Sequence, residues 1–111
     1  MTGTSADPIG PVFAALADPT RRHVVETLVR EGSTSVPALT SALPISRQAI
    51  AKHLAALGDA GLIERADGTS GGREVRYRLR PGALAPASEW LDDTAAAWDA
   101  RLARLKQTVE R

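Results

Sequence analysis

Residues 44–64 read PISRQAIAKHLAALGDAGLIE, and this stretch decides the fold because it predicts one helix with two unlike faces. Ser46 is placed to cap the helix at its N-terminus, and Gly61 is placed to end it. Ile45 and Ile50 are spaced to form a hydrophobic staple across the cap. The buried stripe consists of apolar residues at helical spacing, namely Ile50, Leu54 and Leu57.

The opposite face of this helix is narrow and rich in hydrogen-bond donors. At about 100° per residue, Gln48 and Lys52 lie nearly opposite the buried stripe. Arg47 and Ala51 flank them on one side, and Ala49 flanks them on the other. Small alanines let a helix lie close to a DNA groove, where Gln can pair with adenine and Arg or Lys with guanine or phosphate. Plain solvated surface is the alternative interpretation of such a face.

Three helical segments precede this helix. The spacing predicts helices over 9–17, from Asp18-Pro19 to Gly32, and over 36–43, with residues 33–35 as a turn. Asp18 is a good N-cap, and Pro19 fits the first helical turn. The first eight residues are small and polar, so we expect them to be disordered. The apolar residues expected to face inward are Val12, Phe13 and Leu16, then Val24, Val25, Leu28 and Val29, then Val36, Leu39 and Leu43.

The segment after Gly61 predicts a β-hairpin. Residues 62–65 are strand-like, residues 66–72 read ADGTSGG and form a loop, and residues 73–80 alternate strictly between polar and apolar. The helix over 36–43 and the donor-faced helix after it are joined by a short turn, which is the helix-turn-helix arrangement. A hairpin beside a helix-turn-helix is a wing, and outward arginines on it supply phosphate contacts. The alternation places Val75, Tyr77 and Leu79 toward the core and Arg76, Arg78 and Arg80 outward.

Composition excludes several classes of protein. A chain of 111 residues forms one domain, and the absence of cysteine excludes disulfides, thiolate metal sites and a cysteine nucleophile. No apolar run approaches the roughly 20 residues that span a bilayer, and the first residues lack the regions of a signal peptide. No Ser, His and acid combination has a spacing typical of nucleophilic catalysis. We therefore expect a cytoplasmic protein that is not an enzyme and does not bind a membrane.

The positive charge is concentrated in the middle of the chain. Residues 47–83 hold seven Lys or Arg against four Asp or Glu, a net charge of +3. Residues 1–46 and 84–111 each carry a net charge of −1. A basic segment that contains the donor-faced helix and the wing points to a polyanion, although a solvated basic face has the same composition.

Three stretches carry a resemblance to a known family. LADPTRRHVVETL (16–28), SRQAIAKHLAALGDAGLIER (46–65) and GREVRYRLRPGAL (72–84), in this order, resemble the winged-helix repressors of the ArsR type over about residues 12–84. Members of that family are bacterial homodimers that bind operator DNA and usually release it when an inducer binds. The resemblance implies DNA contacts from Ser46, Arg47, Gln48, Ala49, Lys52 and His53, and from Arg73, Arg76 and Arg78 in the wing.

Three basic residues, one of them in this set, have a structural interpretation as an alternative. His53 lies next to the buried stripe, where a histidine bonded to a backbone group is as reasonable as a DNA contact. Arg21 and Arg22 fit a structural role, with one stem packed on the next helix and its head paired with an acid. The resemblance instead suggests that one of them contacts phosphate. Asp59 and Glu64 are interpreted as surface charges.

The resemblance also implies what this chain lacks. Metal-sensing members of the family carry a cysteine motif on the helix before the turn, or His and Asp ligands on the last helix. Here the only histidines are His23 and His53, on different helices, and the last helix has aspartates but neither His nor Cys. The sequence therefore predicts a metal-independent member with no cofactor and no metal site.

The tail predicts a dimerisation helix. From residue 84 onward, Leu91, Ala95, Trp98, Leu102, Leu105 and Val109 follow one another at alternating steps of four and three residues. A small domain has little need for another apolar seam, so a second copy of the chain is the simplest cover for it. The expected dimer interface consists of Leu91, Trp98, Leu102 and Leu105.

These observations predict a mainly α fold with a small β-hairpin wing, a winged helix-turn-helix of about five helices. Its expected divisions are a disordered N-terminus (1–8), a DNA-binding domain (9–83) and a dimerisation helix (84–111). The expected function is a homodimeric repressor that binds double-stranded operator DNA. The alternative is a winged-helix module that binds a protein and not DNA. A pocket for an unknown small-molecule inducer between the tail and the core is a variant of the first interpretation.

Overall fold

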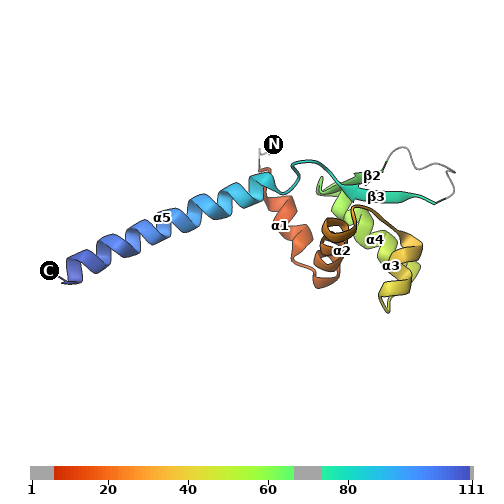
Figure 1. The fold of residues 1–111 in the computed structure, drawn as a ribbon, viewed down its shortest axis with the longest axis horizontal. Coiled ribbons are helices and arrows are strands. Elements are labelled where there is room, and N and C mark those ends of the chain that lie inside the picture. Colours follow the sequence, from red (N-terminus) through yellow and green to blue (C-terminus); the bar gives the residue numbers. More distant parts are fainter. Residues whose placement is uncertain (1–6, 67–73, 111) are drawn as a thin grey trace, which may run out of the picture.

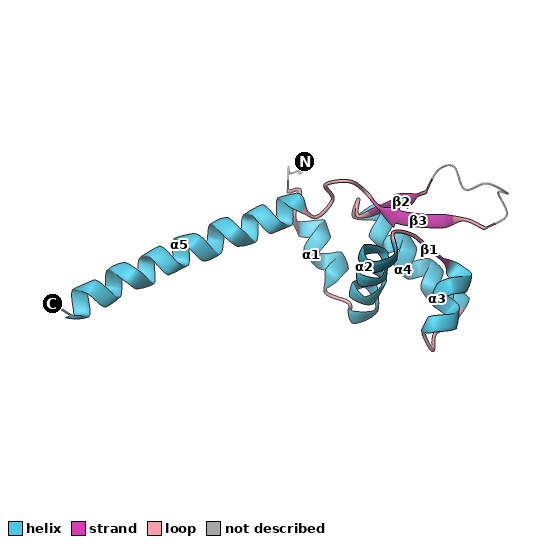
Figure 2. Ribbon diagram, in the orientation of Figure 1, coloured by secondary structure: helices cyan, strands magenta, loops and turns pink. Residues whose placement is uncertain are grey.

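The computed structural model describes residues 7–66 and 74–110, which form five helices and a three-stranded sheet (Figures 1 and 2). The predicted fold class, mainly α with a hairpin wing, is confirmed. Four helices and the sheet pack together, and the last helix extends away from them. In chain order the elements are α1 (Gly10–Leu16), α2 (Pro19–Glu31), β1 (Thr34–Ser35), α3 (Val36–Ala42), α4 (Arg47–Asp59), β2 (Ile63–Arg65), β3 (Arg76–Leu79) and α5 (Ala85–Glu110).

Side-chain caps fix where the helices begin. The Asp18 carboxylate accepts a hydrogen bond from the backbone N–H of Arg21 at 3.0 Å, and Pro19 occupies the first turn of α2. The Ser46 hydroxyl accepts from the N–H of Ala49 at 3.1 Å and caps α4. Gly61 follows α4 with φ of 77°, a conformation that ends a helix and favours glycine. The caps predicted at Asp18 and Ser46 are therefore confirmed.

The core lies between α1, α2, α3, α4 and the sheet. The stripe predicted on α4 is correct, because Ile50, Leu54 and Leu57 are all buried. On α2 the prediction for Val29 is wrong: its side chain is 67% exposed, and Thr27 is buried in its place. At 100° per residue the buried arc of α2 is centred near Leu28, and Val29 falls outside it. The buried apolar residues are Val12, Ala15, Val24, Val25, Leu28, Leu39, Ile50, Leu54, Leu57, Leu62, Ile63 and Ala87.

The sheet has the strand order β1-β3-β2, with both pairs antiparallel. The turn expected at residues 33–35 is therefore wrong in part, since Thr34 and Ser35 form β1 and pair with Tyr77 and Arg76. Both β1 residues are buried. Their partners lie more than 40 residues further along the chain, so the local sequence of small polar residues does not reveal the strand.

The wing departs from the predicted alternation at its start. β3 begins only at Arg76, so Val75 precedes the strand and is 38% exposed instead of facing the core. Tyr77 and Leu79 are half-buried and pack against the core as expected. Arg76 was expected to point outward, but it is half-buried because it lies over the loop that precedes β1. Of the loop predicted at 66–72, residues 67–72 lie outside the described residues, as does Arg73.

The helix α5 differs from the others in its exposure. Ala87 is its buried residue, and its remaining described residues are exposed. Phe13 of α1 meets Trp90 of α5 edge to face, with ring centroids 5.8 Å apart, where α5 leaves the domain. Beyond this point α5 extends into solvent, which gives the molecule a longest dimension of 68 Å (Figure 1). Of the helices that the structure describes, none is long and apolar enough to cross a membrane.

Candidate DNA-binding surface

The outer face of α4 presents three donor side chains that the described part of the domain does not bind. Arg47, Gln48 and Lys52 are exposed, and no described residue makes a hydrogen bond or ion pair with them. The buried stripe on the other side fixes the rotation of α4 on the domain. A rigid helix with free amide and cationic groups on one face can enter a major groove and read base edges.

The start of α4 contributes a second kind of group. Residues 43–46 connect α3 to α4, which is the short connection of a helix-turn-helix. The Ser46 oxygen is used as the cap, but its hydroxyl hydrogen is still available as a donor. Ala49 is half-buried and small, so it allows the helix to approach a groove closely. The beginning of α4 is therefore suited to lie against a DNA backbone.

His53 is held by side chains of α2. It is half-buried, and its Nδ1 lies 3.4 Å from Nη1 of Arg21 and 3.8 Å from Oδ2 of Asp18. The hydrogen bond from the Arg21 backbone N–H holds the pKa of Asp18 below its usual value, and the charges of His53 and Arg21 add to the effect. The ring therefore contacts these two side chains and not the backbone group that the sequence also allowed. It connects α4 to the N-terminus of α2.

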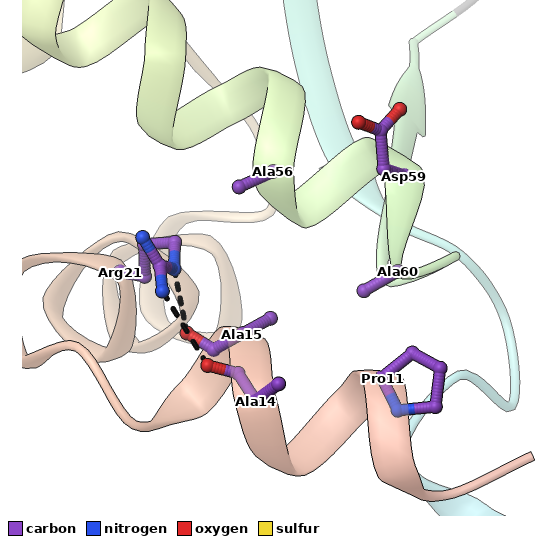
Figure 3. A pocket seen from close by; sticks show the side chains of 7 residues that line it. All are labelled: Pro11, Ala14, Ala15, Arg21, Ala56, Asp59 and Ala60. Atoms are coloured by element: carbon purple, nitrogen blue, oxygen red, sulfur yellow. Dashed lines mark hydrogen bonds between the residues drawn. The ribbon is translucent and has the colours of Figure 1, made fainter.

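Arg21 and Arg22 bind the C-terminal end of α1. Nε of Arg21 donates to the carbonyl of Ala15 at 2.7 Å and Nη2 to that of Ala14 at 3.4 Å, as Figure 3 shows. Nη1 of Arg22 donates to the carbonyl of Leu16 at 2.7 Å. Cations at a helix C-terminus satisfy its orphan carbonyls and complement its dipole. Both arginines thus have a structural role, through carbonyl oxygens and not through the acid that we expected.

A shallow hollow of about 350 Å³ lies beside Arg21, between α1 and the C-terminal half of α4 (Figure 3). Its walls are mainly alanines, and Asp59 stands at its other end. The hollow does not lie between α5 and the core, where the sequence predicts a pocket for an inducer. Its lining residues are Pro11, Ala14, Ala15, Arg21, Ala56, Asp59 and Ala60.

The wing arginines are already engaged. Arg76 donates from Nε to the Ser33 hydroxyl at 3.0 Å, from Nη2 to the Ser33 carbonyl at 3.2 Å and from Nη1 to Glu74 at 2.8 Å. Arg78 pairs with Glu64 at 2.8 Å, and Nε of Arg80 lies 3.7 Å from the same carboxylate. Glu64, interpreted from sequence as a surface charge, is therefore the acid that holds Arg78 of β3 and Arg80, which directly follows the strand. Arg76 connects β3 to the loop before β1.

These partnerships were not predicted from the sequence. Glu64 lies directly opposite Arg78 in the antiparallel pair, so counting the hairpin register outward from its loop could have revealed this ion pair. The pairing of Arg76 with Ser33 and of His53 with α2 joins residues that are more than 30 positions apart. No local pattern signals such contacts.

The predicted interface residues of α5 share one exposed face. Leu91, Trp98, Leu102 and Leu105 are between 45% and 56% exposed, which is unusual for large apolar side chains gathered on one helix. In the part of the chain that the structure describes, no three His, Cys, Asp or Glu side chains gather closely enough to hold a metal ion.

A short helix, a turn and a second helix with a donor-rich outer face, accompanied by a β-hairpin, define a winged helix-turn-helix protein. Residues 16–66 match the family described as Helix-turn-helix domain. The chain belongs to the ArsR family of winged helix-turn-helix transcriptional regulators. This confirms the family to which the three sequence stretches pointed.

Relatives and a solved structure support this assignment. The chain is 40% identical over 82 residues to the arsenic resistance transcriptional regulator ArsR1 of Pseudomonas putida, which covers 73% of this chain but only 58% of that protein. It is 44% identical over 80 residues to the HTH-type transcriptional regulator Rv2034 of Mycobacterium tuberculosis, covering 72% of this chain and 71% of the relative. An ArsR-like transcriptional regulator from Rhodococcus sp. RHA1 has a TM-score of 0.78 and 44% identity, covering 93% of this chain and 91% of that one.

Proposed function

We propose that this regulator is a homodimeric repressor that binds operator DNA with α4 in the major groove and the wing beside it. The observation that carries the proposal is the outer face of α4, where Arg47, Gln48 and Lys52 are exposed and have no partner among the described residues. Because these donors are bonded to water and not to the described domain, they can exchange water for DNA without breaking a hydrogen bond inside that part of the domain. Ser46 and Ala49 would lie at the phosphate backbone where α4 begins.

The other predicted contacts divide into two groups. Arg78 is 45% exposed at its side chain and can leave Glu64 for a phosphate, because surface ion pairs are weak. Arg73 lies outside the described residues and keeps the role implied by the family. His53 and Arg76 are better explained as positioning residues, since each is half-buried and held by other side chains.

The regulator is proposed to act without a metal inducer. Arsenite and the thiophilic metals need thiolate ligands, and this chain has no cysteine. The arsenic named in one relative's description therefore does not transfer to this chain. An inducer, in this proposal, is a small organic molecule. Because operator DNA is in the bacterial cytoplasm, the protein is placed there too.

Footprinting on the DNA upstream of the protein's own gene tests the proposal. A homodimer with two recognition helices is expected to protect an imperfect palindrome whose half-sites lie about 34–36 Å apart, one turn of duplex. The affinity should fall steeply with salt, because phosphate contacts release counterions. A single short protected site, or protection that is independent of sequence, contradicts the proposal.

The alternative is a winged-helix module that binds a protein and has lost DNA binding. Such a module has no use for unpaired cations on α4, so the exposed Arg47 and Lys52 favour DNA. If footprinting at low salt shows no protection anywhere in the DNA upstream of the protein's own gene, the protein-binding module is the correct interpretation.

A further inference from the structure

The basic side chains of this chain are nearly all arginine. Of its 14 Lys and Arg residues, 12 are arginine and two are lysine, Lys52 and Lys106. Lys106 lies near the outer end of α5, whereas Lys52 is exposed on the outer face of α4. Residues 1–84 therefore contain a single lysine, and it lies on the surface proposed to bind DNA.

Most cations of the DNA-binding domain are bonded within it. The arginines that bind carbonyl, hydroxyl or carboxylate groups of described residues are Arg21, Arg22, Arg30, Arg76, Arg78 and Arg80. The side chains of Arg47, Lys52 and Arg65 are exposed and make no hydrogen bond or ion pair within residues 7–66 and 74–110. Lys52 thus supplies one of three free cations in the described part of the domain. A change that removes its charge removes a large share of what this surface offers to a polyanion.

The surroundings of Lys52 on α4 leave its amine without an acidic neighbour. Residues 48–56 read QAIAKHLAA, so no Asp or Glu lies within four residues on either side. Three of the four side chains one helical turn away are alanines, and the fourth is Gln48. Lys106 differs, because Glu110 lies four residues further along α5, at the spacing at which an ammonium and a carboxylate attract each other. Lys52 is therefore the lysine that has no acidic partner at helical spacing.

A lysine amine differs from a guanidinium in that it accepts an acyl group. The delocalised guanidinium stays charged, whereas a lysine Nζ that has lost its proton attacks a carbonyl carbon. With an acyl phosphate, the C–N bond forms, the C–O bond to phosphate breaks, and the phosphate leaves with the bonding pair. The nitrogen gives one proton to water. The product is an amide that carries no charge.

The outer face of α4 also suits the approach of such a reagent. An acyl phosphate is an anion, as DNA is. Gln48 lies one turn before Lys52 on the same face, and no described residue binds its amide N–H groups. Gln48 can therefore donate to the phosphate group while Nζ of Lys52 attacks the neighbouring carbonyl carbon. The face proposed to bind DNA thus also binds a phosphate-activated acyl group.

We propose that Lys52 is an acylation site and that its modification by an acyl phosphate releases the protein from DNA. The inference rests on the DNA-binding role of α4 in the proposed function and adds a covalent regulation of the same surface. Acylation removes one charge and its donors from each copy of α4. Loss of one phosphate contact per copy is expected to raise the operator Kd by at least about tenfold at roughly 0.1 M salt. The salt slope should fall by about 1 for each α4.

Treatment of the full chain with acetyl phosphate tests the proposal. The wild type, Lys52→Arg and Lys106→Arg are each incubated with and without the reagent, and mass spectrometry gives the acetylated fraction at each lysine. Fluorescence anisotropy then gives the operator Kd of every sample, and circular dichroism checks that treated proteins are folded. Any modification of the α-amino group is common to all three proteins, so this comparison cancels it.

The expected result is a rise in Kd that depends on Lys52. Treatment should raise the Kd of the wild type and of Lys106→Arg by the factor given above. Lys52→Arg should have the same Kd before and after treatment, because arginine keeps its charge and is not acylated. Operator DNA gives a second readout: bound DNA covers Nζ of Lys52, so saturating operator should reduce acetylation of Lys52 several-fold and leave that of Lys106 unchanged.

Three results overturn the proposal while leaving the regulator intact. Lys52 that stays unmodified under conditions that acetylate Lys106 has no reactive amine. A wild type that is acetylated at Lys52 and keeps its operator Kd is not regulated there. An equal rise in Kd for treated Lys52→Arg places the effect elsewhere in the chain. An untreated wild type that binds no operator contradicts the proposed function itself.

Discussion

At the level of single residues, one face of α4 carries the side chains that anchor the helix in the domain, and the opposite face carries side chains that are free to bind DNA. Ile50, Leu54 and Leu57 are fixed in the core, and His53 is held beside them by Asp18 and Arg21. Gln48 and Lys52 are exposed and make no hydrogen bond or ion pair with residues 7–66 or 74–110. We therefore expect their substitution to change what the protein binds and to leave its folding nearly unaffected.

Gln48 and Lys52 should differ in how their loss affects DNA binding. We predict that Gln48→Ala relaxes specificity at one base pair by about 1–3 kcal/mol, because an amide pairs with base edges. Lys52→Ala should weaken binding to all sequences and reduce the salt slope by about 1, because an ammonium contacts phosphate. Binding isotherms on operator and mismatched DNA at several salt concentrations check both. Arg30→Ala removes an exposed cation on a different helix, α2, and serves as the matched control.

If both variants bind the operator and mismatched DNA as the wild type does, the assignment of the outer face of α4 is wrong. A loss caused equally by Arg30→Ala points to a general effect of charge. Only a difference between Lys52→Ala and Arg30→Ala locates the contact on α4.

Asp18 gives the stability a dependence on pH with a defined sign. Its pKa is lowered in the folded protein, so the carboxylate contributes stability above its unfolded pKa of about 3.9. This contribution is lost as the pH falls through the lower folded pKa. Asp18→Asn keeps a capping oxygen but removes the charge. We predict that the wild type is the more stable of the two at neutral pH and that the difference shrinks below about pH 4.

Urea unfolding of both proteins from neutral pH down to about pH 2.5 measures this difference. A difference in urea midpoint that is constant across this range contradicts the assignment to the Asp18 charge.

At the level of elements, the wing is attached to the domain by an arginine that sequence patterns assign to DNA. Arg76 makes two hydrogen bonds to Ser33, whereas the partner of Arg78 among the described residues is Glu64 on the neighbouring strand. We predict that Arg76→Ala lowers the free energy of unfolding by about 1–2 kcal/mol through the loss of these bonds. Arg78→Ala should change stability by less than about 0.5 kcal/mol and reduce the salt slope of DNA binding by about 1.

Arg76→Lys separates the charge of Arg76 from its bonding geometry, because lysine keeps the cation but cannot reproduce the planar fork. We expect it to be destabilised nearly as much as Arg76→Ala. A fully stable Arg76→Ala protein with a reduced salt slope shows that Arg76 contacts phosphate after all. Denaturant unfolding and salt titrations on the same samples distinguish the two roles.

The elements that the sequence predicts well are those defined by neighbours along the chain. The caps at Asp18 and Ser46, the buried stripe of α4 and the strand at 63–65 each depend on residues within a few positions. β1 depends on Tyr77 and Arg76, and the position of His53 depends on α2. Such contacts are set by the tertiary fold, so no local pattern could have revealed them. The donor face of α4 was predictable because its periodicity is local.

At the level of the whole molecule, the chain lacks the groups that bind soft metals tightly. It has no cysteine, and His23 and His53 lie on different helices. We predict that one equivalent of Zn²⁺, Cd²⁺ or arsenite leaves the operator affinity unchanged, because a tight site needs three or four converging ligands. Titration of the DNA complex by fluorescence anisotropy checks this. Release of DNA by one equivalent of any of these ions contradicts metal independence.

The helix α5 extends away from the domain and exposes an apolar seam that the described part of the domain does not cover. We predict that replacing Leu102 and Leu105 together with Glu gives a monomer, since two carboxylates in each copy would be buried without partners. Tight operator binding should be lost with the second half-site, while α4 stays intact. The exposed Glu89→Gln and Gln107→Glu changes serve as controls on α5 outside the seam.

Analytical ultracentrifugation and operator binding are measured together on these proteins. A seam variant that is monomeric and yet binds the full operator as tightly as the wild type would show that one copy suffices for recognition. A wild type that sediments as a monomer at micromolar concentration and still binds tightly leads to the same conclusion. We expect the seam variant to be a monomer that binds DNA more weakly and still protects a single half-site. In the proposed function, α5 holds the two copies together and α4 contacts the DNA, so loss of the seam affects only the first of these.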